Sequence, residues 1–414
     1  MSTTESRLTK RTDIPTTPVQ TEYDSIIEFI FTHMNEYTVH PLLLSTALQL
    51  MFAFDTWTFS RADLCRHLFG YILTAISTMP LSLVPRLFHY ICRLLESPVL
   101  VVDHSMVDQL FALTQQITAL PISPSNTDFR TAQHAAVQTL ATAVCYVSGE
   151  GLDFLKQVVQ PIVEKLQTIV PALSQDEERI GGGNGGLIPL VELTDKTVSQ
   201  LRVLAGVFDG CLLEIFANQL AGLCVPVLHA LLHTVLTSSG RNGEMVMNPR
   251  RGEEWKTCRG HILRAIVDVY LSTTRAAETN LDEGNVNYIL MDCNDLLNEE
   301  EFCEQGLIIV DSLLCNAFSL IPQDRRTPVF FSVSNLLSLL LSNHAVGNHL
   351  DSVKYILHIV YVLVKEDREV GMGGAEQVVK MMIGLLNEGM NEDELIRLVL
   401  RQLVYLVTVG NAMN

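Results

Sequence analysis

The feature that most constrains the fold of this chain is an amphipathic helical pattern that continues along almost its whole length. From Thr21 onward, apolar residues recur at positions i, i+3, i+4 and i+7, which places them on one face of a helix. No stretch alternates apolar and polar residues for long enough to predict a strand. The sequence therefore predicts an all-α protein.

The spacing of the breaks in this pattern narrows the fold class further. Glycine, proline, asparagine or clustered charges interrupt the pattern about every 20 to 25 residues, so a pair of helices spans roughly 40 to 47 residues, the period of HEAT and armadillo repeats. We therefore expect a HEAT/armadillo-like right-handed α-solenoid of antiparallel helix pairs. Such proteins expose long surfaces and generally bind other macromolecules.

The apolar composition agrees with stacked helices. At 414 residues the chain exceeds the length at which a single core keeps growing, and it contains 48% hydrophobic against 18% charged residues. Helices covered by neighbours on several sides explain this balance, and membrane insertion is the alternative. We expect no membrane insertion, because the longest nearly apolar runs are shorter than the ~18–20 residues that span a bilayer. These runs are Gly222–Thr237, Val329–Leu341 and Tyr355–Val364.

Composition also divides the chain into segments. Residues 1–20 are polar and predict a disordered lead-in, and residues 21–173 form a first set of HEAT-like helical repeats. Residues 174–190 include five glycines and predict a flexible loop, after which residues 191–414 form a second set. Ser239–Gly252 predicts a second polar loop. No strand precedes the glycines and no Lys-Ser/Thr follows them, so a phosphate-binding loop is not predicted.

Local signals place several helix boundaries. Pro41 opens the helix expected at Pro41–Phe54, where proline suits the first turn. Pro85 lies in the helix expected at Leu81–Leu95, where it is tolerated in a first turn and kinks the helix otherwise. Further along the chain, we expect four helices at Thr194–Asn218, Gln219–Ser238, Asn285–Leu297 and Glu299–Leu320. The last of these would begin with three glutamates in its first turn, where the helix macrodipole favours negative charge.

The chain is acidic, and part of this charge is concentrated. Its formal net charge is −18, from 28 Lys and Arg against 46 Asp and Glu, which disfavours direct nucleic-acid binding and suits basic partners. Between Arg275 and Arg325 the chain has eleven acidic residues and no Lys or Arg. Two interpretations are open: a docking surface for a basic protein segment, or a solvated face. The residues assigned to the docking surface are Asp292, Asp295, Glu299, Glu300, Glu301 and Glu304.

The chain carries no pattern that predicts catalysis. His229 and His233 are spaced as two zinc ligands on one helix face, but Ala230 stands where a metalloprotease has glutamate, so a helix-surface role or a hydrogen bond between helices is favoured. No G-x-S-x-G motif is present. We expect no enzymatic activity, no cofactor and no metal. The nine cysteines occur singly, without a C-x-x-C pair, which indicates buried thiols in a reducing compartment.

Three segments resemble repeats of the importin-beta superfamily, in the transportin-SR group of nuclear import receptors. Thr131–Val170 resembles a mid-chain repeat in which a long helix, a small turn and a helix of the form L..V..P....L follow one another. Asp195–Leu236 is similar to the repeat that comes next, with its P.L...L helix. Leu44–Trp57 resembles the preceding apolar helix that ends near a tryptophan. The likeness covers about half of the chain.

The resemblance implies a receptor that carries protein cargo between cytoplasm and nucleus, with the GTPase Ran as a candidate partner. Family members are about twice as long, and their Ran-binding N-terminal repeats have no counterpart in this sequence. The expected function is therefore a protein-binding α-solenoid, either a nuclear transport receptor or a cargo adaptor that recognises basic segments. The alternative is a structural or regulatory HEAT-repeat scaffold within a larger complex.

Overall fold

The computed structural model describes most of residues 25–404. The expected N-terminal lead-in, Trp57 and the glycines of the first loop lie outside the described residues. The undescribed positions within this span are 27, 31, 38–39, 54–61, 77–79, 81, 98–99, 101–103, 120–126, 146–150, 176–189, 238–248, 300–301, 343–348, 388–395, 398 and 402–403.

The chain divides into two compact units, Met1–Val101 and Val102–Asn414. The described helices of the first unit are α2 (Met34–Tyr37), α3 (Pro41–Ala53), α5 (Ala62–Ile76) and α6 (Val84–Leu95). Those of the second unit are α7 (His104–Ala119), α8 (Thr127–Cys145), α9 (Gly151–Gln175), α10 (Leu190–Gly210), α11 (Glu214–Thr237), α12 (Pro249–Ala277), η3 (Glu278–Asn280), α13 (Glu283–Leu297), α14 (Cys303–Ala317), η4 (Phe318–Leu320), α15 (Gln323–Ser342), α16 (Leu350–Glu366) and α17 (Arg368–Asn387).

The all-α prediction is confirmed, since the described residues form helices and contain no strand. Pro41 begins α3, as expected, and Pro85 lies in the first turn of α6 because this helix begins at Val84 and not at Leu81. One boundary is wrong: the break expected between Asn218 and Gln219 lies inside α11, and the helices separate at 211–213 instead. The periodicity continues through this break because Cys211 is itself buried.

In the first unit, α5 packs against α6 and α2 packs against α3. The ring of Phe52 at the end of α3 stacks on that of Tyr90 in α6, with 4.2 Å between ring centroids. An offset aromatic pair of this kind adds about 0.5–1.5 kcal/mol to the burial of its area.

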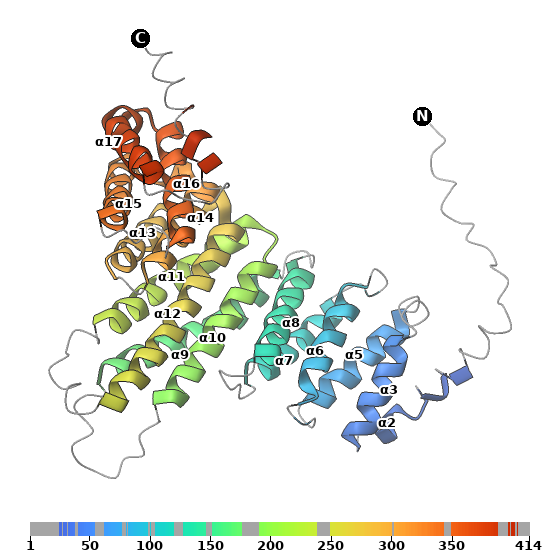
Figure 1. Cartoon of the computed structure of the whole chain (residues 1–414). Coiled ribbons are helices and arrows are strands. Elements are labelled where there is room, and N and C mark those ends of the chain that lie inside the picture. The colour runs from blue at the N-terminus through green and yellow to red at the C-terminus, as the bar shows by residue number, and fades with distance from the viewer. Residues whose placement is uncertain are drawn as a thin grey trace, which may run out of the picture. The chain divides into compact units, whose positions relative to one another are not determined.

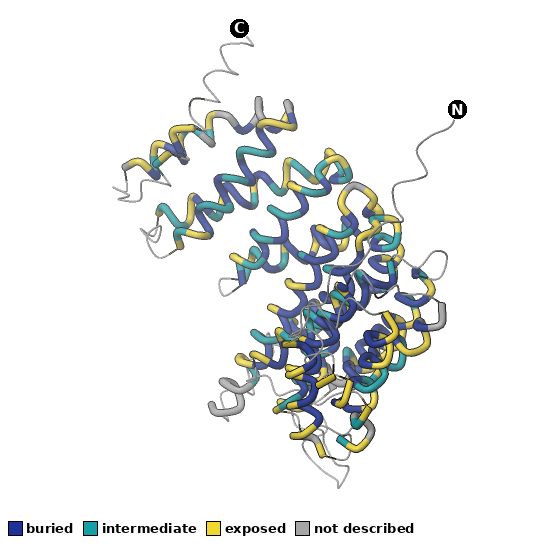
Figure 2. The backbone as a smooth tube through the Cα atoms, turned by 90° about the vertical axis from the view of Figure 1, so that its right-hand side faces the viewer, coloured by how far each residue is buried: buried dark blue, intermediate teal, exposed yellow. Residues whose placement is uncertain are grey.

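The helices of the second unit pack in two rows (Figure 1). The even row runs through α8, α10, α12, α14 and α16, and the odd row runs through α7, α9, α11, α13, α15 and α17; in each row, successive helices are in contact. Contacts between consecutive helices, such as α13 with α14 and α16 with α17, join the rows. Figure 2 shows buried and exposed stretches alternating within individual helices, as amphipathic helices require.

The two expected loops do not separate compact units. Helices before the glycine-rich segment pack on helices after it, α8 on α10 and α9 on α11. The division falls after Val101 instead, because it depends on contacts between helices and not on local composition. Of the first loop, Ser174 and Gln175 belong to the end of α9. Of the second, Pro249–Gly252 forms the start of α12, and the remainder lies outside the described residues.

Two described helical segments, Glu214–Thr237 and Cys303–Leu320, are long and apolar enough to cross a membrane by length and composition alone. The apolar run Gly222–Thr237 underestimates the length of the first segment, because α11 begins eight residues before this run. Half of its most apolar window is buried inside the protein, and a buried core helix passes the same test.

The helices α8 and α10 approach each other closely where Gly210 meets the backbone of α8. A Cβ atom added at Gly210 would lie 2.1 Å from the carbonyl oxygen of Gln138 and 2.8 Å from the Cβ atom of Ala141. The hydroxyl of Thr142 donates to the Gly210 carbonyl over 3.1 Å. The two helices can approach this closely only because Gly210 has no side chain.

We expect Gly210→Ala to lower the free energy of unfolding by about 1–3 kcal/mol, since α8 and α10 must move apart. Gly222→Ala is the matched control: Gly222 is exposed inside α11 and has nothing within 4 Å of an added Cβ, so this change should stabilise by about 0.5–1 kcal/mol. Denaturant unfolding followed by circular dichroism measures both. Effects of equal sign and size would contradict the proposed close contact.

Candidate protein-binding surface

Asp292, assigned to the acidic docking surface, is fully buried in the second unit, and its assignment is wrong. It lies on α13 and accepts hydrogen bonds from two other helices: from the Tyr270 hydroxyl on α12, and from Nδ1 of His229 on α11 over 2.5 Å. The His229 ring also lies 4.9 Å from that of Tyr288 between centroids. His229 thus makes the helix–helix hydrogen bond expected of it, whereas His233 is exposed.

The other predicted residues are dispersed. Asp295 is half-buried and lines a cavity of about 300 Å³ between α13 and α15, together with Arg325, Met291 and Pro328. This cavity therefore carries one formal charge of each sign. Because Asp295 faces a base there, it adds little to an acidic docking surface.

The glutamates before α14 also differ from expectation. Glu299 precedes the helix, which begins at Cys303, and its carboxylate pairs with the Arg259 guanidinium at 3.1 Å. Among the described members of the predicted set, only Glu304 is classed as exposed, and it lies in the first turn of α14. The remaining two, Glu300 and Glu301, lie outside the described residues. The structure therefore does not gather the described members of the predicted set on one surface.

A different set of acidic residues does come together, at the turns that lead into the odd-row helices. We call this set the acidic edge. Glu278 lies in η3, in the turn that leads to α13, and the other members lie in or beside the first turn of α11, α13, α15 or α17. All except half-buried Glu214 are exposed. The members are Glu214, Glu278, Asp282, Glu283, Asp324 and Glu369.

Hydrogen bonds and one contact between short helices join these turns into a continuous edge. The Asn280 side chain donates to the Glu214 carboxylate, and the Asp282 backbone N–H donates to the Asn218 side chain over 2.9 Å, so the α12–α13 turn lies beside the start of α11. The helices η3 and η4 are in contact, which places the α14–α15 turn next. Gln323 then donates to Glu369 over 2.9 Å and brings in the start of α17.

Apolar side chains border the acidic edge at its α11 end. Leu212, Leu213 and Ile215 are 51%, 43% and 65% exposed around Glu214. Three large apolar side chains exposed together in one turn leave apolar surface in water that a bound partner would cover. Arg325, beside Asp324, is also exposed, so the edge is not uniformly acidic.

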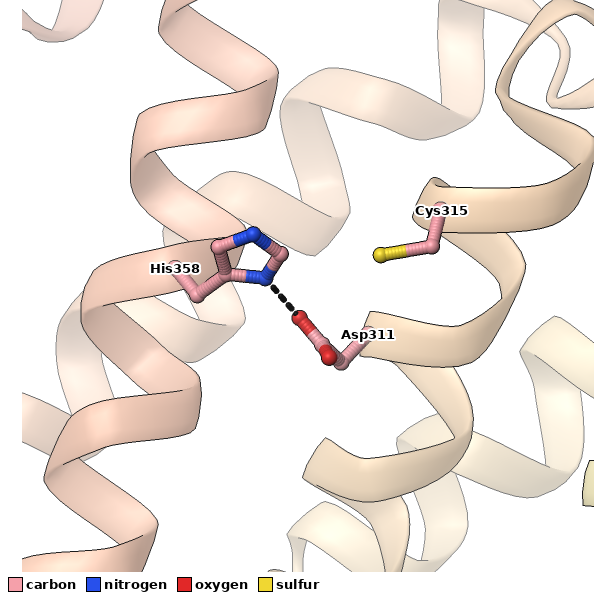
Figure 3. Close-up of side chains that lie close together, drawn as sticks. All are labelled: Asp311, Cys315 and His358. Atoms are coloured by element: carbon pink, nitrogen blue, oxygen red, sulfur yellow. Dashed lines mark hydrogen bonds and ion pairs between the residues drawn. The ribbon is translucent and has the colours of Figure 1, made fainter.

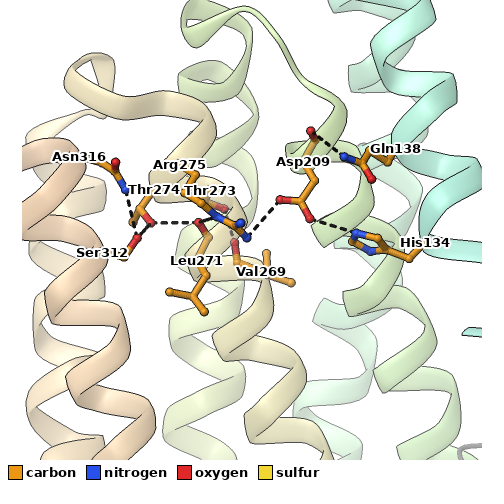
Figure 4. A network of polar contacts seen from close by, with 10 residues as sticks. All are labelled: His134, Gln138, Asp209, Val269, Leu271, Thr273, Thr274, Arg275, Ser312 and Asn316. Carbon is orange, nitrogen blue, oxygen red and sulfur yellow. Dashed lines mark hydrogen bonds and ion pairs between the residues drawn. The ribbon is translucent and has the colours of Figure 1, made fainter. Parts of the chain in front are cut away.

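A polar network connects neighbouring helices of the even row (Figure 4). Asp209 on α10 accepts from Nε2 of His134 on α8 over 3.0 Å and pairs with Arg275 on α12 at 3.4 Å. Next to Arg275, the Thr274 hydroxyl bonds the Ser312 hydroxyl on α14 over 2.7 Å. These contacts hold the helices of this row in register.

The electrostatics of Asp209 fit this structural role. Burial acts to raise the pKa of Asp209, but hydrogen bonds from His134 and Ser272 and the charge of Arg275 outweigh burial, so the pKa lies below its ordinary value. Asp209 is therefore ionised at neutral pH and paired within the even row. It is not available to the acidic edge.

Comparison with known proteins identifies no family for this chain. No protein-family model matches it, and no curated protein matches it. The resemblance to the importin-beta superfamily therefore stays a prediction.

The pH dependence of stability tests the burial of Asp292. Burial raises the pKa of Asp292 above its ordinary value of 3.8, although the Tyr270 and His229 hydrogen bonds act in the opposite direction. The native state therefore binds this proton more tightly than the unfolded state, and its contribution to stability falls as pH rises from 3.8 through the raised value. At pH values above the raised pKa, the contribution of Asp292 to stability stays at its minimum.

We expect the unfolding free energy of wild type minus that of Asp292→Asn to decline with rising pH in this window, as measured by denaturant unfolding across the acid range. Tyr270→Phe removes a hydrogen bond to the carboxylate, so it should cost about 1–3 kcal/mol and move the decline to higher pH. A wild-type-minus-variant difference that does not change with pH would show that Asp292 is solvated and not buried.

Proposed function

We propose that the second unit is a HEAT-like right-handed α-solenoid that binds a basic segment of a partner protein along its acidic edge. The observation that carries this proposal is the line of carboxylates on four successive odd-row turns, exposed except for half-buried Glu214, with the turns joined by hydrogen bonds and by the contact between η3 and η4. In this role the chain acts as a transport receptor or cargo adaptor.

The solenoid part of the proposal is supported by the pattern of helix contacts. Each helix of the second unit touches its neighbour in the chain and the next helix of its own row, as repeat proteins do when each unit contacts only adjacent units. A stack of this kind aligns equivalent turns along one edge. Residues placed at one position of the repeat then form an extended surface.

The electrostatic part rests on many modest contacts. An exposed ion pair contributes about 0–1 kcal/mol, so a single carboxylate on the edge would bind a basic side chain weakly. Six carboxylates along one edge can engage several basic residues of one segment and attract it from a distance at low salt. The exposed Leu212, Leu213 and Ile215 favour a segment that also carries apolar residues.

First-turn acids also have a purely structural explanation, because the helix macrodipole favours them in any helix. The even row offers a direct comparison. Asp128, Glu192 and Asp351 are exposed acids in the first turns of α8, α10 and α16. Since α10 has 21 residues, its first turn lies about 30 Å from its other end, near which the acidic edge begins. That distance is about three Debye lengths at 0.1 M salt.

We expect the triple variant Glu283→Gln, Asp324→Asn, Glu369→Gln to bind an Arg- and Leu-containing peptide about tenfold more weakly than wild type. Three lost pairs of about 0.5 kcal/mol each amount to about 1.5 kcal/mol, and a tenfold change in affinity corresponds to about 1.4 kcal/mol. Fluorescence anisotropy at low and high ionic strength measures the affinity, which should also fall with salt for wild type.

The control is the triple variant Asp128→Asn, Glu192→Gln, Asp351→Asn, which makes the same change in net charge at the same helix position in the even row. It should bind like wild type. If both triple variants lose affinity equally, the attraction comes from net charge and the acidic edge is a solvated face.

A second experiment separates transport from scaffolding. Capture of Ran by the immobilised protein in its GTP-loaded form, and not in its GDP-loaded form, would support the transport role that the resemblance implies. Equal or absent capture would favour an adaptor or a scaffold of a larger complex.

A further inference from the structure

Three potential metal ligands, none of them a member of the acidic edge, converge between α14 and α16 (Figure 3). Asp311 and Cys315 lie one turn apart on α14, and His358 projects from α16 toward them. One carboxylate oxygen, the thiol sulfur and one ring nitrogen all lie within 4.8 Å of one another. Nδ1 of His358 is hydrogen-bonded to the Asp311 carboxylate, which fixes the ring beside the thiol.

We propose that Asp311, Cys315 and His358 bind a zinc ion. Zinc prefers four ligands drawn from thiolate, imidazole and carboxylate, and this set supplies one of each. Magnesium and calcium are disfavoured, because they select oxygen ligands and two of the three groups offer sulfur and nitrogen. Residue spacing does not indicate this site, since Asp311 and Cys315 are 47 and 43 residues from His358.

The site requires little rearrangement. Zinc bonds of about 2.0–2.3 Å in a tetrahedron place ligand atoms about 3.3–3.8 Å apart. Side-chain rotations that move the ligand atoms by about 1 Å would bring them to these separations. Cys315 is exposed and Asp311 and His358 are half-buried, so an ion can enter from solvent and a water molecule can complete its coordination. Binding releases the thiol proton and whatever proton the histidine and carboxylate share.

Bound zinc would join α14 to α16 directly. These helices are neighbours in the even row, so the ion would link two consecutive helix pairs of the second unit. Because such a site does not pre-exist in the unfolded chain, its binding energy stabilises the fold.

The test is metal uptake by the full-length protein with zinc and with cobalt(II) as a spectroscopic substitute. We expect wild type to retain one more zinc ion per chain than Cys315→Ser, His358→Gln or Asp311→Asn after dialysis. Cobalt-loaded wild type should show a thiolate-to-cobalt charge-transfer band that Cys315→Ser lacks. Zinc should raise the melting temperature of wild type and not that of His358→Gln.

Matched controls lie on the same two helices. Cys303→Ser on α14, and His349→Gln and Asp351→Asn at the start of α16, should keep the extra ion, the band and the thermal shift. Circular dichroism of each metal-free variant checks the fold, and any one site variant with native helicity suffices for the comparison. Equal zinc uptake by wild type and a folded site variant, or a charge-transfer band that survives Cys315→Ser, would overturn the proposal. Neither readout depends on peptide binding at the acidic edge.

Discussion

The arrangement of the second unit depends on the burial of two or more sides of each helix by its neighbours. An amphipathic helix covers one apolar face in a globular core, but α10 packs against α8, α12 and α9 together, and its apolar side chains are buried on each of these sides. A chain with 48% hydrophobic residues can bury so much apolar surface only if its helices cover one another in this way. Polar contacts such as those of Asp209 then select the register, because they are satisfied at only one relative position of the helices.

The helical content and several helix starts could be predicted, because they depend on residues close together in the sequence. Pro41 and Pro85 act through their own backbone, and the apolar period determines which residues enter the core. The separation of α10 from α11 could not be predicted, since it lies beside Gly210, whose role is set by the backbone of α8 about 70 residues earlier.

The candidate site was harder to predict for the same reason. From the sequence, Asp292 is assigned to the surface. Met291 and Asn294 near it are indeed exposed, and its hydrogen-bond partners Tyr270 and His229 lie 22 and 63 residues away. A buried carboxylate is tolerated only with such partners, and periodicity carries no information about them. The first-turn acids of the odd-row helices are visible in the sequence, but even-row helices such as α8, α10 and α16 carry them too, so the acidic edge becomes a surface only once the rows are known.

Confining contacts to adjacent helices also gives the second unit mechanical compliance. A small change in the angle between two neighbouring helices disturbs only the contacts at that interface, and equal changes at successive interfaces add up along a row. The distance between successive turns along the acidic edge, at the starts of α11, α13, α15 and α17, could then change by fractions of an ångström at each step. A partner segment whose charges are spaced unevenly could thereby be matched without rebuilding any single helix pair.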